Sequence, residues 1–151
     1  MNRLGLENLL SELAPRLEGR GISHVRSPAP DATVLELADP GNESLVISTS
    51  RALPLLFLAP GGEAPRGGET PQSLRTLKGG RIRSVRPGSG GPSAVLLLTR
   101  RDPVGIESDL ALLVELGRRP GLSVARTGAE EPTDEFGRET TRASVSWWRD
   151  E

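Results

Sequence analysis

The sequence contains no cysteine, which excludes a disulfide framework, a thiolate-bound metal and a cysteine nucleophile. Its one histidine, His24, rules out a multi-histidine metal site. No carboxylate partner can be named for it, so we expect an ordinary strand residue and not a catalytic base. Aromatic residues make up only 3% of the chain, which leaves little material for stacking on nucleic-acid bases.

Long apolar runs are also missing. The longest, residues 53–59, is interrupted by Pro54 and is far shorter than the ~20 residues needed to cross a bilayer. The first residues lack the apolar core of a signal peptide. We therefore expect a cytoplasmic protein with no membrane partner. Its 151 residues are enough for one domain with a real core.

Charge is balanced overall but not along the chain, with 19 Lys and Arg against 20 Asp and Glu. Residues 130–151 hold seven acids and three arginines, which leaves residues 1–129 with a net charge of +3. This predicts a domain at 1–129 followed by an acidic, polar C-terminal tail or linker at 130–151. The pair Trp147 and Trp148 in that tail is a partner anchor, folds back onto the domain or belongs to a next segment that is cut short here; the sequence leaves all three open.

Hydrophobic periodicity predicts the elements of the domain. Leucines at three- and four-residue steps predict a helix over 4–18, ended by glycine. A second, short helix is expected after Thr70 and Pro71, a cap followed by proline, and it should end at Gly79 and Gly80. Strands are predicted at 22–27, 32–38, 45–50, 53–59, 81–86, 94–99, 110–116 and 122–126.

Two stretches of the chain repeat at an offset of 60 residues: LEGRGISHVR at 17–26 matches LKGGRIRSVR at 77–86. In each stretch, the end of a predicted helix is followed by glycine and then by a predicted strand. The predicted fold class is therefore α+β, a pseudo-repeat of two helix-strand-strand units. We expect two β-sheets, sandwich or barrel-like with about eight strands, flanked by two helices.

Motifs of catalysis are absent. The sequence has no phosphate loop, dinucleotide-binding glycine pattern, zinc-protease helix or serine elbow. Glu107 and Asp109 are expected to be solvated, not an acid–base pair. We predict that the protein is not an enzyme and that it has no cofactor, catalytic residue or metal site.

The strongest chemical feature is a basic stretch around the second predicted helix and the strand after it. The stretch runs from Arg66 to Arg86 and contains Arg66, Arg75, Lys78, Arg81, Arg83 and Arg86, of which the last five are the candidate RNA contacts. Arg81 and Arg83 are two residues apart on a predicted strand and so should share a face. Guanidinium groups suit phosphate oxygens, so the stretch is a candidate RNA-binding surface. The alternative, that these are simply solvated side chains, stays open.

In order and spacing, five short segments resemble the N-terminal domain of NFACT proteins, a family that includes the ribosome quality-control factor RqcH and fibronectin-binding protein A. They are LEGRGI at 17–22, LVISTS at 45–50, PLLFL at 54–58, LRTLKGGRI at 74–82 and LVELGR at 113–118. The resemblance runs from about residue 4 to 129. It implies a fold similar to the N-terminal domain of formamidopyrimidine-DNA glycosylases.

The resemblance also implies a function: RNA and ribosome binding, with transfer RNA and the large ribosomal subunit as partners in ribosome quality control. It adds Arg118 and Arg119 as secondary RNA contacts. Where the family carries an Asp-Arg pair, this chain has the turn GSGGP at 88–92, which implies weakened or altered RNA handling. The alternative is a degenerate domain that binds a protein through apolar strand residues such as Leu55 and Phe57 or through the tryptophan pair. The sequence predicts no oligomeric state.

Overall fold

An amphipathic helix opens the fold. The computed structural model describes residues 3–38, 42–88 and 91–127, and its first element is helix α1 (Arg3–Leu17), as predicted. Leu6, Leu10, Leu13 and Leu17 are buried on one side of this helix. The predicted tail at 130–151, with Trp147 and Trp148, lies outside the described residues. No helix in the described ranges is long and apolar enough to cross a membrane.

Eight strands follow, each within a few residues of its predicted position. They are β1 (Gly21–Ala29), β2 (Ala32–Ala38), β3 (Glu43–Thr49), β4 (Pro54–Pro60), β5 (Arg81–Pro87), β6 (Ser93–Arg101), β7 (Glu107–Glu115) and β8 (Gly121–Thr127). Strands β1 to β4 form one antiparallel meander and β5 to β8 form another. The α+β class and the number of strands are therefore confirmed.

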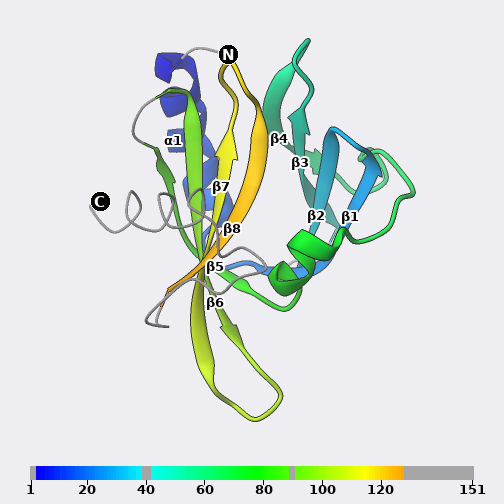
Figure 1. Ribbon diagram of the computed structural model, residues 1–151, viewed down its shortest axis with the longest axis vertical. Helices are drawn as coiled ribbons and strands as arrows, with labels where there is room; N and C mark the ends of the chain where they lie inside the picture. The colour runs from blue at the N-terminus through cyan, green and yellow to red at the C-terminus, as the bar shows by residue number, and fades with distance from the viewer. Residues whose placement is uncertain (1–2, 39–41, 89–90, 128–151) are drawn as a thin grey trace.

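The expectation of two separate sheets is wrong. All eight strands form a single open sheet in the order β4-β3-β2-β1-β5-β6-β7-β8. The two meanders are joined where β1 pairs with β5 at one position, Gly21 opposite Arg81. Figure 1 shows β1 to β4 on one side of the molecule and β5 to β8 on the other, with the β6–β7 hairpin extending beyond both.

The predicted repeat appears directly at this junction, where four backbone hydrogen bonds form two matched pairs. In the first pair, Gly19 N–H donates to Ile82 O (2.7 Å) and its repeat equivalent Gly79 N–H donates to Ile22 O (2.8 Å). In the second pair, Ile22 N–H donates to Gly80 O and Ile82 N–H donates to Arg20 O, both at 2.8 Å. Gly19 and Gly79 both have a φ close to +90°, a conformation that favours glycine. The two strands therefore meet with approximate two-fold symmetry.

The second predicted helix is only partly correct, because the structure has a six-residue 3-10 helix, η1 (Gln72–Leu77), and not an α-helix. It buries Leu74 and Leu77 but has no further apolar turn to hold a longer helix in place. The predicted threonine cap is wrong as well: the Thr70 hydroxyl donates to the Val25 carbonyl at 2.6 Å. Within residues 3–38, 42–88 and 91–127 there is therefore one α-helix, which contacts β5 and β6.

The core is continuous across the two meanders. One cluster of buried side chains includes the leucines of α1, Leu35 and Ile47 from the first meander, and Leu96 and Leu112 from the second. A second, small cluster of Val34, Val46 and Ala59 lies on the other face of the first meander. We call the sheet face that carries this second cluster the outer face of β1–β4. Ala64, from the loop of residues 61–69, packs against it.

Candidate functional site

The predicted basic residues are all exposed, but they do not form one cluster. Arg75 lies on η1, Lys78 directly follows it, and Arg81, Arg83 and Arg86 lie along β5. Their side chains therefore reach solvent, as phosphate contact requires. The positions along β5 decide which of them come together.

Arg81 and Arg83 lie on one face of the sheet. Arg81 is opposite Thr99 on β6, which is opposite Asp109 on β7. The Arg83 Nη1 group donates to Asp109 Oδ1 at 3.2 Å, so Arg83 reaches across the same face. A β-bulge between Ile82 and Ser84 breaks the regular alternation here. The Arg81 guanidinium also donates to the Gly19 carbonyl at the junction.

A further arginine, which the sequence analysis missed, lies beside the start of β5 but on the opposite face of the sheet from Arg81, because Arg100 alternates with Thr99 along β6. The Arg100 Nε group donates to the Lys78 carbonyl oxygen at 3.1 Å. Because Arg100 directly follows Thr99, the partner of Arg81, it brings the end of β6 beside the start of β5. We call Lys78, Arg81 and Arg83 the β5 cationic group and leave Arg100 out of it. The adjacent basic residues at 100–101 were the only sequence signal for Arg100.

The other predicted basic residues lie elsewhere. Arg86 is near the end of β5, opposite Val95. Arg118 and Arg119 lie in the connection between β7 and β8, where they line a pocket with Pro92 and Glu115. The basic residues therefore divide between the start of β5 and the opposite end of the second meander. Arg118 and Arg119 do not extend the β5 cationic group.

An apolar stripe lies on the edge strand β4. Leu55 and Phe57 are opposite Ser48 and Val46 of β3, on the outer face of β1–β4. Phe57 is 42% exposed and Leu53, just before the strand, is 63% exposed, whereas Leu56 between them points into the core and is 2% exposed. Leu53, Leu55 and Phe57 therefore form a partly exposed stripe, which we call the β4 apolar stripe.

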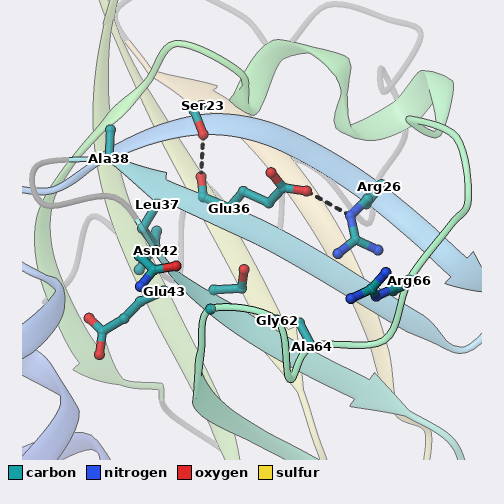
Figure 2. A pocket seen from close by; sticks show the side chains of 12 residues that line it. Ser23, Arg26, Glu36, Leu37, Ala38, Asn42, Glu43, Gly62, Ala64 and Arg66 are labelled. Atoms are coloured by element: carbon teal, nitrogen blue, oxygen red, sulfur yellow. Dashed lines mark hydrogen bonds and ion pairs between the residues drawn. The ribbon is translucent and has the colours of Figure 1, made fainter.

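A polar cleft with a volume of about 630 Å³ opens between β1–β3 and the loop that follows β4 (Figure 2). Arg26 of β1 crosses it: its Nε group pairs with Glu36 Oε2 at 2.7 Å, and its Nη1 group donates to the Pro65 and Gly67 carbonyls at 2.5 and 3.0 Å. Arg66, between those two carbonyls, lines the same cleft.

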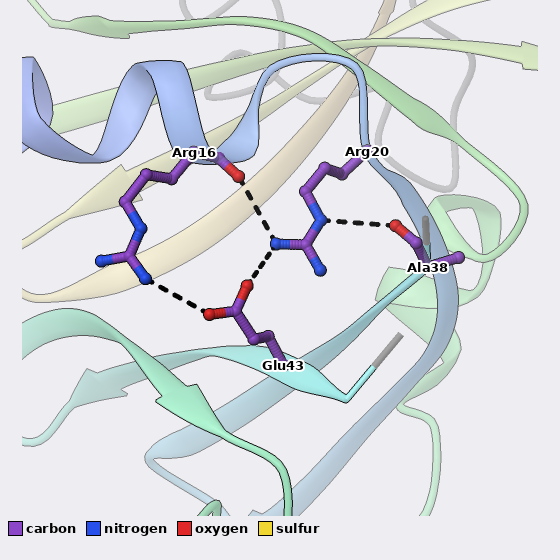
Figure 3. Close-up of polar contacts among 4 residues, drawn as sticks. All are labelled: Arg16, Arg20, Ala38 and Glu43. Atoms are coloured by element: carbon purple, nitrogen blue, oxygen red, sulfur yellow. Dashed lines mark hydrogen bonds and ion pairs between the residues drawn. The ribbon is translucent and has the colours of Figure 1, made fainter. Parts of the chain in front are cut away.

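An ion cluster around the buried Arg20 borders this cleft (Figure 3). The Arg20 Nη1 group donates to Glu43 Oε1 at 2.5 Å, and Arg16 Nη2 donates to Glu43 Oε2 at 3.3 Å. Arg20 also donates to the Ala38 carbonyl at 3.3 Å. The hydrogen bond from Arg20 is the main cause that holds the pKa of Glu43 below its ordinary value, against the opposing effect of burial. Glu43 is therefore an ionised counter-charge to two guanidinium groups.

Groups suited to metal binding are lacking in the described ranges, where no three His, Asp or Glu side chains come together. His24, on β1, is exposed and lies opposite Glu36 in the strand register. Glu107 and Asp109 form ion pairs with Arg101 and Arg83 respectively. These acids therefore act as partners of arginines.

Comparison with solved structures identifies the fold. The N-terminal domain of fibronectin-binding protein PavA from Streptococcus pneumoniae superposes with a TM-score of 0.70 at 17% identity, over 87% of this chain and 51% of that one. The N-terminal part of the fibronectin/fibrinogen-binding protein from Streptococcus suis superposes with a TM-score of 0.76 at 17% identity, over 89% of this chain and 52% of that one. The chain has the NFACT N-terminal fold.

A third structure agrees: the fibrinogen-binding protein from Staphylococcus aureus gives a TM-score of 0.67 at 17% identity, over 85% of this chain and 48% of that one. The chain thus spans about half the length of these three solved chains. No family model and no curated protein sequence matches it. The resemblance to the NFACT N-terminal domain is confirmed as a fold, and the likeness to glycosylases stays a prediction.

Proposed function

We propose that this chain is a non-catalytic RNA-binding domain, which holds RNA phosphates with the β5 cationic group. The observation that carries the proposal is that Arg81 and Arg83 are exposed on one face of the sheet at the start of β5, with Lys78 exposed just before the strand. Of these, Arg83 is paired with a carboxylate, Asp109. Guanidinium and ammonium groups on an exposed surface attract phosphates without reading sequence.

Two further features support this function. Arg75 lies on η1, one turn before Lys78, and can extend the same surface. The NFACT N-terminal fold adds transfer RNA and the large ribosomal subunit as the expected partners, in ribosome quality control in the cytoplasm. In this proposal the chain supplies affinity for the phosphate backbone, and a partner or further domain supplies selectivity.

The test is binding of transfer RNA and of large ribosomal subunits to the purified chain between ~50 and 200 mM salt. Binding should weaken steeply with salt, and Lys78→Glu should lower the affinity at low salt by about tenfold through repulsion of a phosphate. Arg51→Glu, which makes the same charge change at an exposed position before β4, is the matched control. An equal loss in both variants, or no binding at ~50 mM salt, would reject the proposal.

A second candidate function is protein binding through the β4 apolar stripe. The specific observation is that Leu53, Leu55 and Phe57 share one partly exposed stripe at an open edge of the sheet. Exposed apolar patches of this kind commonly mark protein interfaces. The solved structures with this fold are described as fibronectin- and fibrinogen-binding proteins, which makes these two proteins the natural first probes.

The two functions separate by their response to salt. Protein binding through the stripe should persist at 200 mM salt and should fall in a Leu55→Ser/Phe57→Ser variant, because burial of apolar surface is not screened. Lys78→Glu should leave it unchanged. If immobilised fibronectin and fibrinogen capture neither the parent chain nor Lys78→Glu, the second candidate is rejected for these two partners.

A further inference from the structure

We propose that the cleft between β1–β3 and the loop of residues 61–69 binds a phosphorylated small molecule of about mononucleotide size, with Arg66 and Arg26 holding its phosphate. The cleft is on the outer face of β1–β4, whereas the RNA surface proposed above begins at β5. The inference is therefore independent of the proposed function.

The loop that closes the cleft is fixed in place. Arg26 Nη1 holds the carbonyls on both sides of Arg66, at 2.5 Å to Pro65 and 3.0 Å to Gly67. Further along the loop, Ser27 N–H donates to the Glu69 carbonyl at 2.9 Å. The backbone of Arg66 thus lies across the Arg26 guanidinium before any ligand arrives, so little backbone entropy of this loop remains to be lost on binding.

The charge balance of the cleft favours an anion. Both carboxylates that line it are already paired: Glu36 with Arg26, and Glu43 with Arg20 and Arg16. Arg66 makes no ion pair or hydrogen bond with the described residues, so its charge is not balanced there. The lining holds two guanidinium groups, Arg26 and Arg66, and two carboxylates, Glu36 and Glu43. Because Arg20 and Arg16 pair with Glu43 and Arg26 pairs with Glu36, Arg66 is left as the lining charge without a partner, and a concave site concentrates its potential.

The chemistry of these groups selects phosphate. A guanidinium presents paired N–H donors that match two phosphate oxygens, and such charge-assisted bonds are stronger than neutral ones. Arg66 can offer its whole donor set, while Arg26 keeps its Nη2 group after binding Glu36 and the loop. The phosphate is therefore expected at the end of the cleft where these two side chains lie near each other (Figure 2).

The rest of the cleft fits a larger body attached to that phosphate. Its volume of about 630 Å³ is far more than a phosphate fills and is within the usual range for small-ligand sites. Asn42 and Ser44 line it as hydrogen-bonding groups, and Leu37, Ala38 and Ala64 supply apolar contact. This mixture suits a sugar or nucleoside more than a purely ionic ligand.

Titration calorimetry on the full chain tests the proposal, with adenosine monophosphate, ribose 5-phosphate, inorganic phosphate and adenosine as probes. Both phosphate esters should bind, adenosine should not, and the Arg66→Gln variant should lose about tenfold or more in affinity for the esters. Arg51→Gln removes the same charge from an exposed position outside the cleft and should change the affinity less than about twofold, as expected for a distant exposed charge.

Three results would overturn the inference: no heat from any phosphate probe at millimolar concentration, unchanged affinity in Arg66→Gln, or an equal loss in Arg66→Gln and Arg51→Gln. Thermal unfolding of both variants serves as the folding control, since Arg66 and Arg51 are exposed. Binding of adenosine as tight as that of its monophosphate would also contradict it, because the arginines would then have no part in recognition.

Discussion

Arg20 is the one buried charged residue in the described part of the chain, at 7% exposure. A buried guanidinium is costly unless its donors are satisfied. Here the Arg20 guanidinium donates to the Glu43 carboxylate at the start of β3 and to the Ala38 carbonyl at the end of β2. These bonds connect the turn after α1 to both strands. Arg20 also lies at the β1–β5 junction through its backbone carbonyl.

Replacing Glu43 with glutamine should destabilise the fold by about 1–3 kcal/mol, since the Arg20 guanidinium would be left buried without its counter-charge. Urea unfolding of the parent chain and the Glu43→Gln variant measures the difference. Arg51→Gln, at an exposed position, is the control for a change in net charge. A difference within the error of the control would mean that Arg20 finds another partner.

The ion pair between Arg20 and Glu43 also predicts that the stability of the fold depends on pH. Because the pKa of Glu43 is lowered on folding from its ordinary value of 4.5, the unfolded state binds its proton first as the pH falls. Its contribution to stability is therefore complete above that ordinary value and is lost as the pH falls through the folded pKa. The stability gap between parent and Glu43→Gln should stay constant from pH 7 to the ordinary value and shrink below it; a gap that widens in acid would contradict this account.

At the scale of elements, the junction of β1 and β5 depends on two glycines in the left-handed region. Gly79→Ala should cost about 1–2 kcal/mol, because φ is +88° there and a Cβ opposes that conformation even though its nearest neighbour, Arg100 Nε, would be 4.0 Å away. Gly121→Ala, at the start of β8 with no atom near the new methyl group and no positive φ, is the matched control and should be nearly neutral. Thermal unfolding compares the two.

Strand β4 gives a second test, since neighbouring residues face opposite sides. Leu56→Ala should lower the free energy of unfolding by about 2–5 kcal/mol, because it opens a cavity in the core, whereas Phe57→Ala should cost clearly less. Denaturant unfolding of the two variants measures this. A larger loss for Phe57→Ala would place the β4 apolar stripe inside the fold and remove it as a docking surface.

The elements were largely predictable because their signals are local. Short apolar runs bounded by turn residues located the strands, and the 60-residue repeat predicted that a helix end, a glycine and a strand follow one another in both halves. The single sheet was not predictable, since one pairing, Gly21 with Arg81, decides it and leaves no periodic pattern. The second helix was over-predicted because its capping signal was strong while only Leu74 and Leu77 anchor it.

The candidate sites were predictable only where they depend on neighbours in sequence. The basic run from Arg66 to Arg86 stood out in the sequence, but the pairing of β5 with β6 brings Arg100 to the Lys78 backbone from over 20 residues away, which no local pattern showed. The cleft was not predictable at all. Arg26 and Arg66 are brought together by a loop that crosses the sheet, and no spacing rule relates them.

At the scale of the whole molecule, both meanders share one core, so the chain should unfold as a unit. Leu35→Ala in β2 and Leu96→Ala in β6 remove equally buried side chains from the two halves. Each should raise amide hydrogen exchange of the slowest protons by the same factor in both meanders, because those protons exchange through global unfolding. Faster exchange confined to the mutated half would show two independent units.

The edge strand β4 begins and ends with proline, at Pro54 and Pro60. Proline has no N–H to donate, so another strand that approaches this edge finds hydrogen-bonding donors only between the two rings. A fibril needs a long, uninterrupted edge to which identical strands can add. The short edge of β4 therefore limits such growth, and the apolar stripe beside it can stay open to solvent without turning each molecule into a template for the next.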